Sequence, residues 1–145
     1  MSDWKTPLRL VEQLDKKGNI HEKGVKKLVS AVKEASELGE KLGCAEFIAF
    51  ATSAVRSAPN SEAVLDEVEK KTGVRLQILS GVEEARLTFL SARRWYGWSA
   101  GRITNLDIGG GSLELSTGTD EHPDLAFSLD PVSYTHLRAH ETRGN

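Results

Sequence analysis

The spacing of apolar residues along the chain predicts three helices. Over Glu22–Leu42 apolar side chains recur every three or four positions, which makes one apolar stripe on a helix. Gly43 follows at the position where a left-handed residue commonly ends a helix. A second helix is predicted over Glu62–Lys71 with Gly73 after it, and a third over Glu83–Tyr96.

Residues at the ends of these helices suit the backbone groups there. Asn60 or Ser61 can cap the second helix, because a side-chain oxygen can accept a hydrogen bond from an unpaired backbone N–H. The third helix begins with acidic residues and ends with Arg93 and Arg94, so both ends match the helix dipole. The aromatic residues at its end are expected to pack under the hairpin that follows; they are Trp95, Tyr96 and Trp98.

Shorter apolar runs predict the strands. Glu46–Ala51 is a nearly continuous apolar run, as expected of a strand buried on both faces, and Val74–Leu79 alternates. Two more strands are expected over Ile103–Ile108 and Leu113–Thr117, on either side of three glycines. This order of helices and strands predicts an α/β domain with a parallel element.

Composition agrees with one soluble globular domain. The 145 residues carry a net charge of −2 and include 13 glycines, 4 prolines and one cysteine, Cys44. The weak charge offers no basic field for nucleic acid, and one cysteine excludes a disulfide framework and a cysteine-based zinc site. No apolar run approaches the roughly 18–20 residues of a membrane span, and the first residues lack the order of a signal peptide. A cytoplasmic location is therefore expected.

The strongest chemical signal is the sequence Asp107-Ile-Gly-Gly-Gly-Ser112, with Glu114 two residues further on. Consecutive glycines let the backbone turn tightly and gather several N–H groups, which suits a phosphate. Ser112 can add a hydroxyl donor, and Asp107 is placed to hold Mg²⁺ through its waters. A Rossmann loop is excluded because position 114 is not glycine, and no Gly-Lys-Ser/Thr of a Walker A loop occurs. The alternative is a plain glycine hairpin turn.

Two further segments offer groups for phosphate chemistry. In Ser80-Gly-Val-Glu-Glu84 one of the adjacent carboxylates can deprotonate a water that attacks phosphorus, or both can merely match the helix dipole. Arg56 follows the strand Glu46–Ala51, and open α/β sheets bind ligands at the carboxyl ends of their strands. Its guanidinium can clamp a phosphate, and the alternative is an exposed loop arginine.

Residues 131–145 do not follow the pattern of the rest of the chain. They lack core periodicity and look like translated read-through of a sequencing adapter, so we exclude them from the fold; a frayed C-terminus is the alternative. His136 and His140 would share one helix face there, as a metal pair does. Their place in this tail argues against a metal site.

Together these segments resemble the exopolyphosphatase and guanosine pentaphosphate phosphohydrolase family (Ppx/GppA), part of the actin-like and sugar-kinase superfamily. The resemblance runs from about Lys5 to Asp130 and rests on three motifs in the correct order and spacing. The motifs are Ala51-Thr-Ser-Ala-Val-Arg56 with Asn60, Ser80-Gly-Val-Glu-Glu-Ala-Arg86, and Asp107-Ile-Gly-Gly-Gly-Ser-Leu-Glu114. The implied fold is an actin-like (ribonuclease H-like) α/β domain, a mixed sheet with flanking helices.

The resemblance implies a role for each candidate residue. Glu84 would be the catalytic base that activates the water, and Glu114 would serve the metal and water. Asp107 would hold Mg²⁺ or another divalent cation, and Arg56 would contact the phosphate chain. The second phosphate-binding loop would consist of Gly109, Gly110, Gly111 and Ser112. The implied reaction is metal-assisted hydrolysis of a terminal phosphoanhydride of inorganic polyphosphate or guanosine pentaphosphate.

The resemblance also divides the chain. Residues 1–100 would be an incomplete first lobe, residues 101–130 the start of a second lobe, and residues 131–145 an artefactual tail. The family's first phosphate loop, Asp-x-Gly-Ser-Asn, does not occur, and the chain would start near the third strand of the family, at Leu8–Leu14.

Such a fragment is expected to be inactive or nearly so and marginally stable, although a full-length parent can form a homodimer. The alternatives are a noncatalytic module that binds polyphosphate or a nucleotide, and a relative of sugar or acetate kinases.

Overall fold

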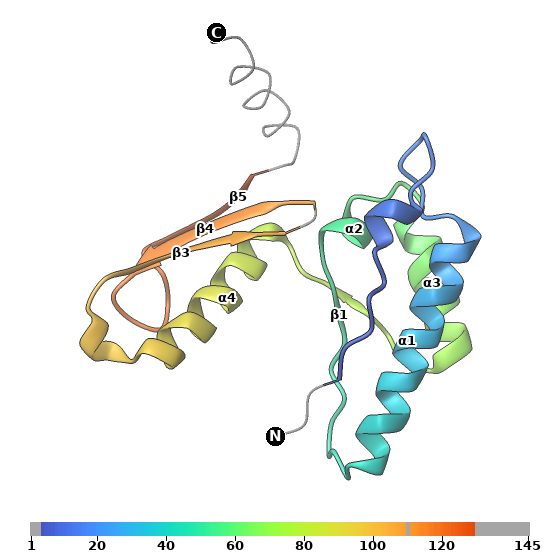
Figure 1. The fold of residues 1–145 in the computed structure, drawn as a ribbon, viewed down its shortest axis with the longest axis horizontal. Helices are drawn as coiled ribbons and strands as arrows, with labels where there is room; N and C mark the ends of the chain where they lie inside the picture. The colour runs from blue at the N-terminus through green and yellow to red at the C-terminus, as the bar shows by residue number, and fades with distance from the viewer. Residues whose placement is uncertain (1–3, 110, 130–145) are drawn as a thin grey trace, which may run out of the picture. The chain divides into compact units, whose positions relative to one another are not determined.

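The computed structural model describes residues 4–109 and 111–129. The chain forms two compact units that divide between Ile78 and Leu79. Helices alternate with strands along the chain, so the α/β class predicted from the sequence is confirmed (Figure 1). In the two described ranges no helix is long and apolar enough to cross a membrane.

The first unit consists of two long helices, short helical turns and a parallel pair of short strands. In chain order its elements are η1 (Leu10–Gln13), α1 (Glu22–Lys41), β1 (Phe50–Ala51), α2 (Ser53–Arg56), α3 (Ser61–Thr72) and β2 (Gln77–Ile78). The two strands pair with Phe50 opposite Gln77 and Ala51 opposite Ile78. As predicted, glycines with positive φ follow α1 and α3: Gly43 at 69° and Gly73 at 74°.

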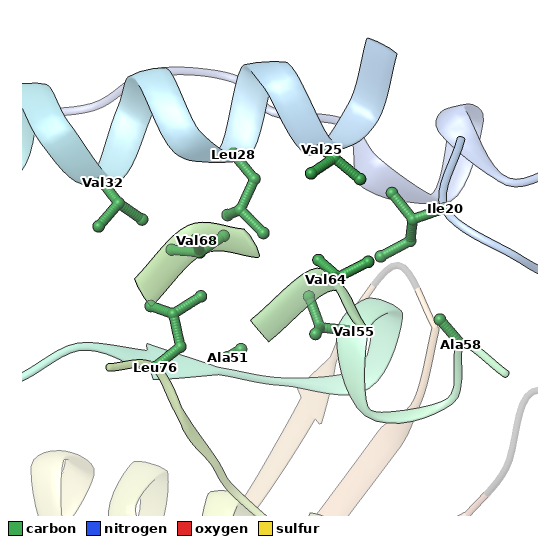
Figure 2. Close-up of a cluster of buried hydrophobic side chains, with 10 residues drawn as sticks. All are labelled: Ile20, Val25, Leu28, Val32, Ala51, Val55, Ala58, Val64, Val68 and Leu76. Atoms are coloured by element: carbon green, nitrogen blue, oxygen red, sulfur yellow. The ribbon is translucent and has the colours of Figure 1, made fainter. Parts of the chain in front are cut away.

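The core of the first unit lies between α1, α3 and the strand pair (Figure 2). Each aliphatic side chain buried there contributes about 1.5–3 kcal/mol relative to an exposed one. The cluster contains Ile20, Val25, Leu28, Val32, Ala51, Val55, Ala58, Val64, Val68 and Leu76.

The strand predictions for the first unit are wrong at one segment and too long at two others. The predicted strand Val74–Leu79 is a strand only at Gln77–Ile78. The segment Leu8–Leu14 contains the 3-10 helix η1 instead of a strand. The run Glu46–Ala51 is a strand only at Phe50–Ala51, and its side chains Ile48 and Phe50 are exposed. The helices cover the face on which Ala51 lies, and the alternating side chains on the other face reach solvent.

The cap prediction at α3 is right in position and wrong in mechanism. Asn60 is the N-cap residue of α3, but its side chain makes no capping hydrogen bond. Its carboxamide instead binds the backbone of Ile20, 40 residues earlier in the chain.

The second unit packs one helix on a three-stranded antiparallel sheet of order β3-β4-β5 (Figure 1). Its elements are α4 (Gly81–Tyr96), η2 (Trp98–Ala100), β3 (Ile103–Ile108), β4 (Leu113–Gly118) and β5 (Leu125–Leu129). The first two strands match the prediction, and β5 was not predicted.

The aromatic residues at the end of α4 do not pack under the hairpin as predicted. Trp95 is 84% exposed and Tyr96 is 67% exposed. The buried stripe of α4 consists of Ala85, Phe89 and Arg93, each four residues apart. Trp95 and Tyr96 lie off this stripe, so they face water.

Candidate phosphate-binding and catalytic site

The hairpin of β3 and β4 carries the glycine loop at its turn. Asp107 is paired with Glu114 across the two strands. The N–H of Gly109 donates to the carbonyl of Ser112 at 3.0 Å and closes the turn. Directly paired residues of antiparallel strands project from the same face of a sheet. The two carboxylates therefore belong to one face, next to the loop.

That face of the sheet is covered by α4 and is polar. Ser112, which directly precedes β4, is buried together with Glu114 and Ser116 on β4, and Glu114 is only 1% exposed. The Ser128 hydroxyl on β5 donates to Glu114 Oε1 at 2.8 Å, whereas the buried Ser116 Oγ has no hydrogen-bond partner among the described residues. Burying polar groups without full pairing costs free energy, so a row of them is atypical of a purely structural core.

Contacts along α4 show how the helix runs over β3. At one end, Arg93 Nη2 donates to the carbonyls of Gly101 at 2.8 Å and Gly118 at 2.9 Å. Further along, Asn105 Nδ2 on β3 donates to Thr88 Oγ1 at 3.2 Å. The residue numbers fall along α4 as they rise along β3, so the helix is antiparallel to the strand.

This direction brings Glu84 to the end of the sheet that carries the loop. From Thr88 to Glu84 the helix advances one turn, about 6 Å. From Asn105 to Asp107 the strand advances about 7 Å in the same direction. Glu84 and Asp107 are therefore at the same end of the second unit, beside the loop after β3.

The two adjacent acids at the start of α4 have different surroundings. Glu83 forms a capping box: its N–H donates to Ser80 Oγ at 3.2 Å, and its Oε2 accepts from the Ser80 N–H at 2.8 Å. The Ser80 hydroxyl also donates to this carboxylate, and these bonds hold the pKa of Glu83 below its ordinary value. Glu83 therefore performs the capping, whereas Glu84 also lies in the first turn, where it matches the helix dipole. The role of Glu84 as a base stays a prediction.

The glycine at position 109 is not required by the fold. Its φ is not in the left-handed region, and a Cβ built on it would lie 3.5 Å from the Ser112 carbonyl oxygen, an ordinary contact. A plain hairpin turn therefore does not need glycine at this position. A ligand that approaches the backbone closely would need it, because a side chain would stand in the way. Gly111 is partly buried and Gly110 is outside the described residues, as are His136 and His140.

Arg56 belongs to the first unit, where it ends α2. Its N–H donates to the Thr52 carbonyl at 3.0 Å, and its side chain is half-buried. Its approach to a phosphate bound in the second unit stays a prediction.

Three residues that support the site were not predicted from the sequence: Thr88, Asn105 and Ser128. Asn105 could have been found, because it lies two residues before Asp107 and so projects from the same face. Ser128 could not, because β5 was not predicted and its register with β4 sets the contact to Glu114.

The paired carboxylates suit a magnesium ion that is shared with a ligand. In the described ranges no group of three or more His, Cys, Asp or Glu side chains is arranged to hold a metal. Mg²⁺ in phosphate-handling proteins is held by one or two carboxylates together with waters and substrate phosphates. Asp107 and Glu114 are two carboxylates on one face of the sheet, and their binding of Mg²⁺ stays a prediction.

Solved structures show which class of fold this is. The structure of an exopolyphosphatase from Cytophaga hutchinsonii matches with a TM-score of 0.83 at 23% identity, covering 96% of this chain and 45% of that one. A Ppx/GppA family member from Aquifex aeolicus matches with a TM-score of 0.77 at 23% identity, covering 95% and 44%. The chain therefore has the α/β fold of an actin-like ATPase domain.

The family follows from the sequence comparison. The model of the Ppx/GppA phosphatase family matches residues 1–132, and the chain belongs to this family. It is 60% identical over 129 residues to exopolyphosphatase 1 of Mycobacterium leprae and equally to that of Mycobacterium tuberculosis. These matches cover 89% of this chain and 38% of each relative, so the chain spans less than half of their length.

Proposed function

We propose that this chain carries the water-activating and phosphate-binding residues of an exopolyphosphatase. The observation that carries the proposal is the convergence at one end of the second unit. There the cross-strand pair Asp107 and Glu114 lies beside the glycine loop, and α4 brings Glu84 to the same end. The family and the relatives named exopolyphosphatase agree with this chemistry.

Each residue has one task in the proposed hydrolysis. The Glu84 carboxylate accepts a proton from a water whose oxygen attacks the terminal phosphorus. A new bond forms between this oxygen and the terminal phosphorus, and the phosphoanhydride bond to the next phosphate breaks. The shortened polyphosphate is the leaving group, and the terminal phosphate is released as orthophosphate. The loop of Gly109, Gly110 and Gly111, with the Ser112 hydroxyl, would bind the phosphoryl oxygens, on which negative charge is concentrated. The Gly109 N–H is not one of the donors, because it closes the turn onto the Ser112 carbonyl at 3.0 Å.

Asp107 and Glu114 would hold a divalent cation, most simply Mg²⁺. When bound, such a cation neutralises negative charge on phosphate oxygens. Ser128 keeps the Glu114 carboxylate oriented through its hydrogen bond at 2.8 Å. Arg56, from the first unit, would contact the phosphate chain.

The proposed substrate is inorganic polyphosphate, with guanosine pentaphosphate as a second substrate of the same bond type. Both substrates have a terminal phosphoanhydride, which the proposed base Glu84 and the hydrogen-bond donors of the glycine loop would act on in the same way. We propose a cytoplasmic enzyme whose full-length form can dimerise and which needs no nucleic acid. Residues 1–100 and 101–130 would be parts of its two lobes. The chain alone is expected to be inactive or nearly so, because it spans only 38% of its relatives' length.

A chimera tests the proposal. The 129 matching residues of this chain replace those of the Mycobacterium tuberculosis exopolyphosphatase 1, to which they are 60% identical. Release of orthophosphate from polyphosphate is measured with and without Mg²⁺, and guanosine pentaphosphate is assayed in parallel. We expect turnover that needs the cation, and a loss of about a hundredfold or more in kcat in Glu84→Gln.

The neighbouring acid provides the matched control. Glu83→Gln makes the same chemical change one residue away, in a side chain assigned to the helix cap. It should retain kcat within about twofold. Equal losses in the two variants would contradict the role of Glu84. Saturable binding of polyphosphate by the chimera without turnover would instead support the noncatalytic binding module.

A further inference from the structure

The side chain of Asn60 joins two segments that are far apart in the sequence. Its Oδ1 accepts a hydrogen bond from the Ile20 N–H at 2.9 Å, and its Nδ2 donates to the Ile20 carbonyl at 2.8 Å. The carboxamide thus pairs with both backbone groups of one residue, as a neighbouring strand would. Both bonds are partly buried, so they are shielded from competition with water.

The segment on the Ile20 side is a hydrogen-bonded turn. The Asp15 carboxylate accepts hydrogen bonds from the N–H groups of Lys17 at 2.7 Å and Asn19 at 2.9 Å. Leu14 and Ile20 form an antiparallel bridge across the base of the turn. The turn also approaches the segment that holds Asn60, because a Cβ built on Gly18 would lie 3.6 Å from Pro59 Cδ.

The segment on the Asn60 side leads directly back to Arg56. The Ala58 N–H donates to the Val55 carbonyl at 3.2 Å, and the Ser61 N–H donates to the Ala58 carbonyl at 3.0 Å. These bonds run without interruption from α2 to the start of α3. If Asn60 moves, α2 and its last residue, Arg56, are therefore expected to move with it.

Apolar packing under this region does not fix its position by itself. Ile20, Val55 and Ala58 lie in one core cluster (Figure 2). Contacts between such aliphatic groups are non-directional, so they hold the segments together without pairing particular backbone groups. The two hydrogen bonds of Asn60 are directional, and they select one register of the α2–α3 connection on the turn.

We propose that Asn60 is a positioning residue for Arg56. It holds the α2–α3 connection on the Asp15–Ile20 turn, so that the Arg56 guanidinium is presented to the anionic phosphate chain. The inference rests on the proposed function, in which Arg56 contacts that chain. It assigns Asn60 no contact with the substrate and no part in capping α3.

Asn60→Ser distinguishes positioning from capping. Serine is as good an N-cap residue as asparagine but is too short to bind both backbone groups of Ile20. In the chimera we expect the KM for polyphosphate to rise about tenfold while kcat changes less than about twofold, as loss of a binding contact predicts. Asn60→Asp keeps the acceptor for the Ile20 N–H and places a carboxylate against the Ile20 carbonyl, so its KM should rise at least as far.

Val68→Ala is the matched control for simple destabilisation. Val68 is fully buried in the same unit but lies on the far part of α3, away from this contact. It should lower the melting temperature of the chimera and leave KM unchanged. An unchanged KM in Asn60→Ser, or an equal rise in Val68→Ala, would overturn the positioning role while turnover still supports the proposed function. Absence of turnover in the unsubstituted chimera would overturn both.

Discussion

Arg93 is a buried cation whose hydrogen-bond acceptors are all backbone carbonyls. It is 0% exposed, and its guanidinium donates to Gly97 at 3.2 Å, Gly101 at 2.8 Å and Gly118 at 2.9 Å. It also lies 5.7 Å from the centre of the Phe89 ring. One side chain thus ties the end of α4, the loop after it and the end of β4 together. We predict that Arg93→Met strongly destabilises the second unit.

The magnitude follows from what each carbonyl loses. Gly118 is buried, so its carbonyl would lose its donor without access to water, at about 1–3 kcal/mol. Gly97 and Gly101 are more accessible, and the lost bonds there cost about 0.5–1 kcal/mol each. Relief of the buried charge acts in the opposite direction. The expected loss is about 3 kcal/mol, a large share of the 5–15 kcal/mol that stabilises a typical domain.

Urea unfolding, followed by circular dichroism and by tryptophan fluorescence, measures the effect. Trp98 is the reporter for the second unit, because its indole N–H donates to Asp120 Oδ1 at 3.2 Å in the folded state. Arg94→Met is the control, since Arg94 is exposed and its ion pair with Glu121 at 3.4 Å should contribute less than about 1 kcal/mol. A loss below about 1 kcal/mol in Arg93→Met, or equal losses in the two variants, would refute the reasoning.

Three further predictions concern single side chains. Because folding lowers the pKa of Glu83, this carboxylate stabilises the fold at pH values above its ordinary pKa of 4.5. The stabilisation is lost as the pH falls through the lower pKa of the folded state. Thermal unfolding of Glu83→Gln should therefore vary less between about pH 5 and 2 than that of the parent. Gly109→Ala should unfold within about 0.5 kcal/mol of the parent. The added methyl group should nevertheless raise the chimera's KM for polyphosphate, and an unchanged KM would count against the loop. Gly118→Ala should lower the free energy of unfolding in urea by about 1–3 kcal/mol, because its Cβ would lie 2.9 Å from Pro123 Cα. An unchanged free energy of unfolding would show that the backbone at Pro123 moves aside.

Local sequence determined the elements whose stabilising contacts are close in the chain. The apolar period predicted α1 to within one residue, and the strands around the glycine loop began where alternation placed them. The end of α4 at Tyr96 and the glycine stops after α1 and α3 were also correctly located, whereas α4 begins at Gly81, two residues before the predicted start. In these elements the decisive bonds join residues about four apart or paired across a tight turn, so the pattern alone carries the information.

Tertiary structure decided which faces are inside and which partners distant residues find. Alternation in β4 indicates two faces but not which of them α4 covers, and the covered face holds Glu114 and Ser116, not the leucines. Asn60 reads as a helix cap in the sequence, yet its partner is Ile20. Arg93 and Arg94 look equivalent, and only one is buried. Each outcome depends on backbone groups many residues away that no local period encodes, because such groups become neighbours only once the chain has packed.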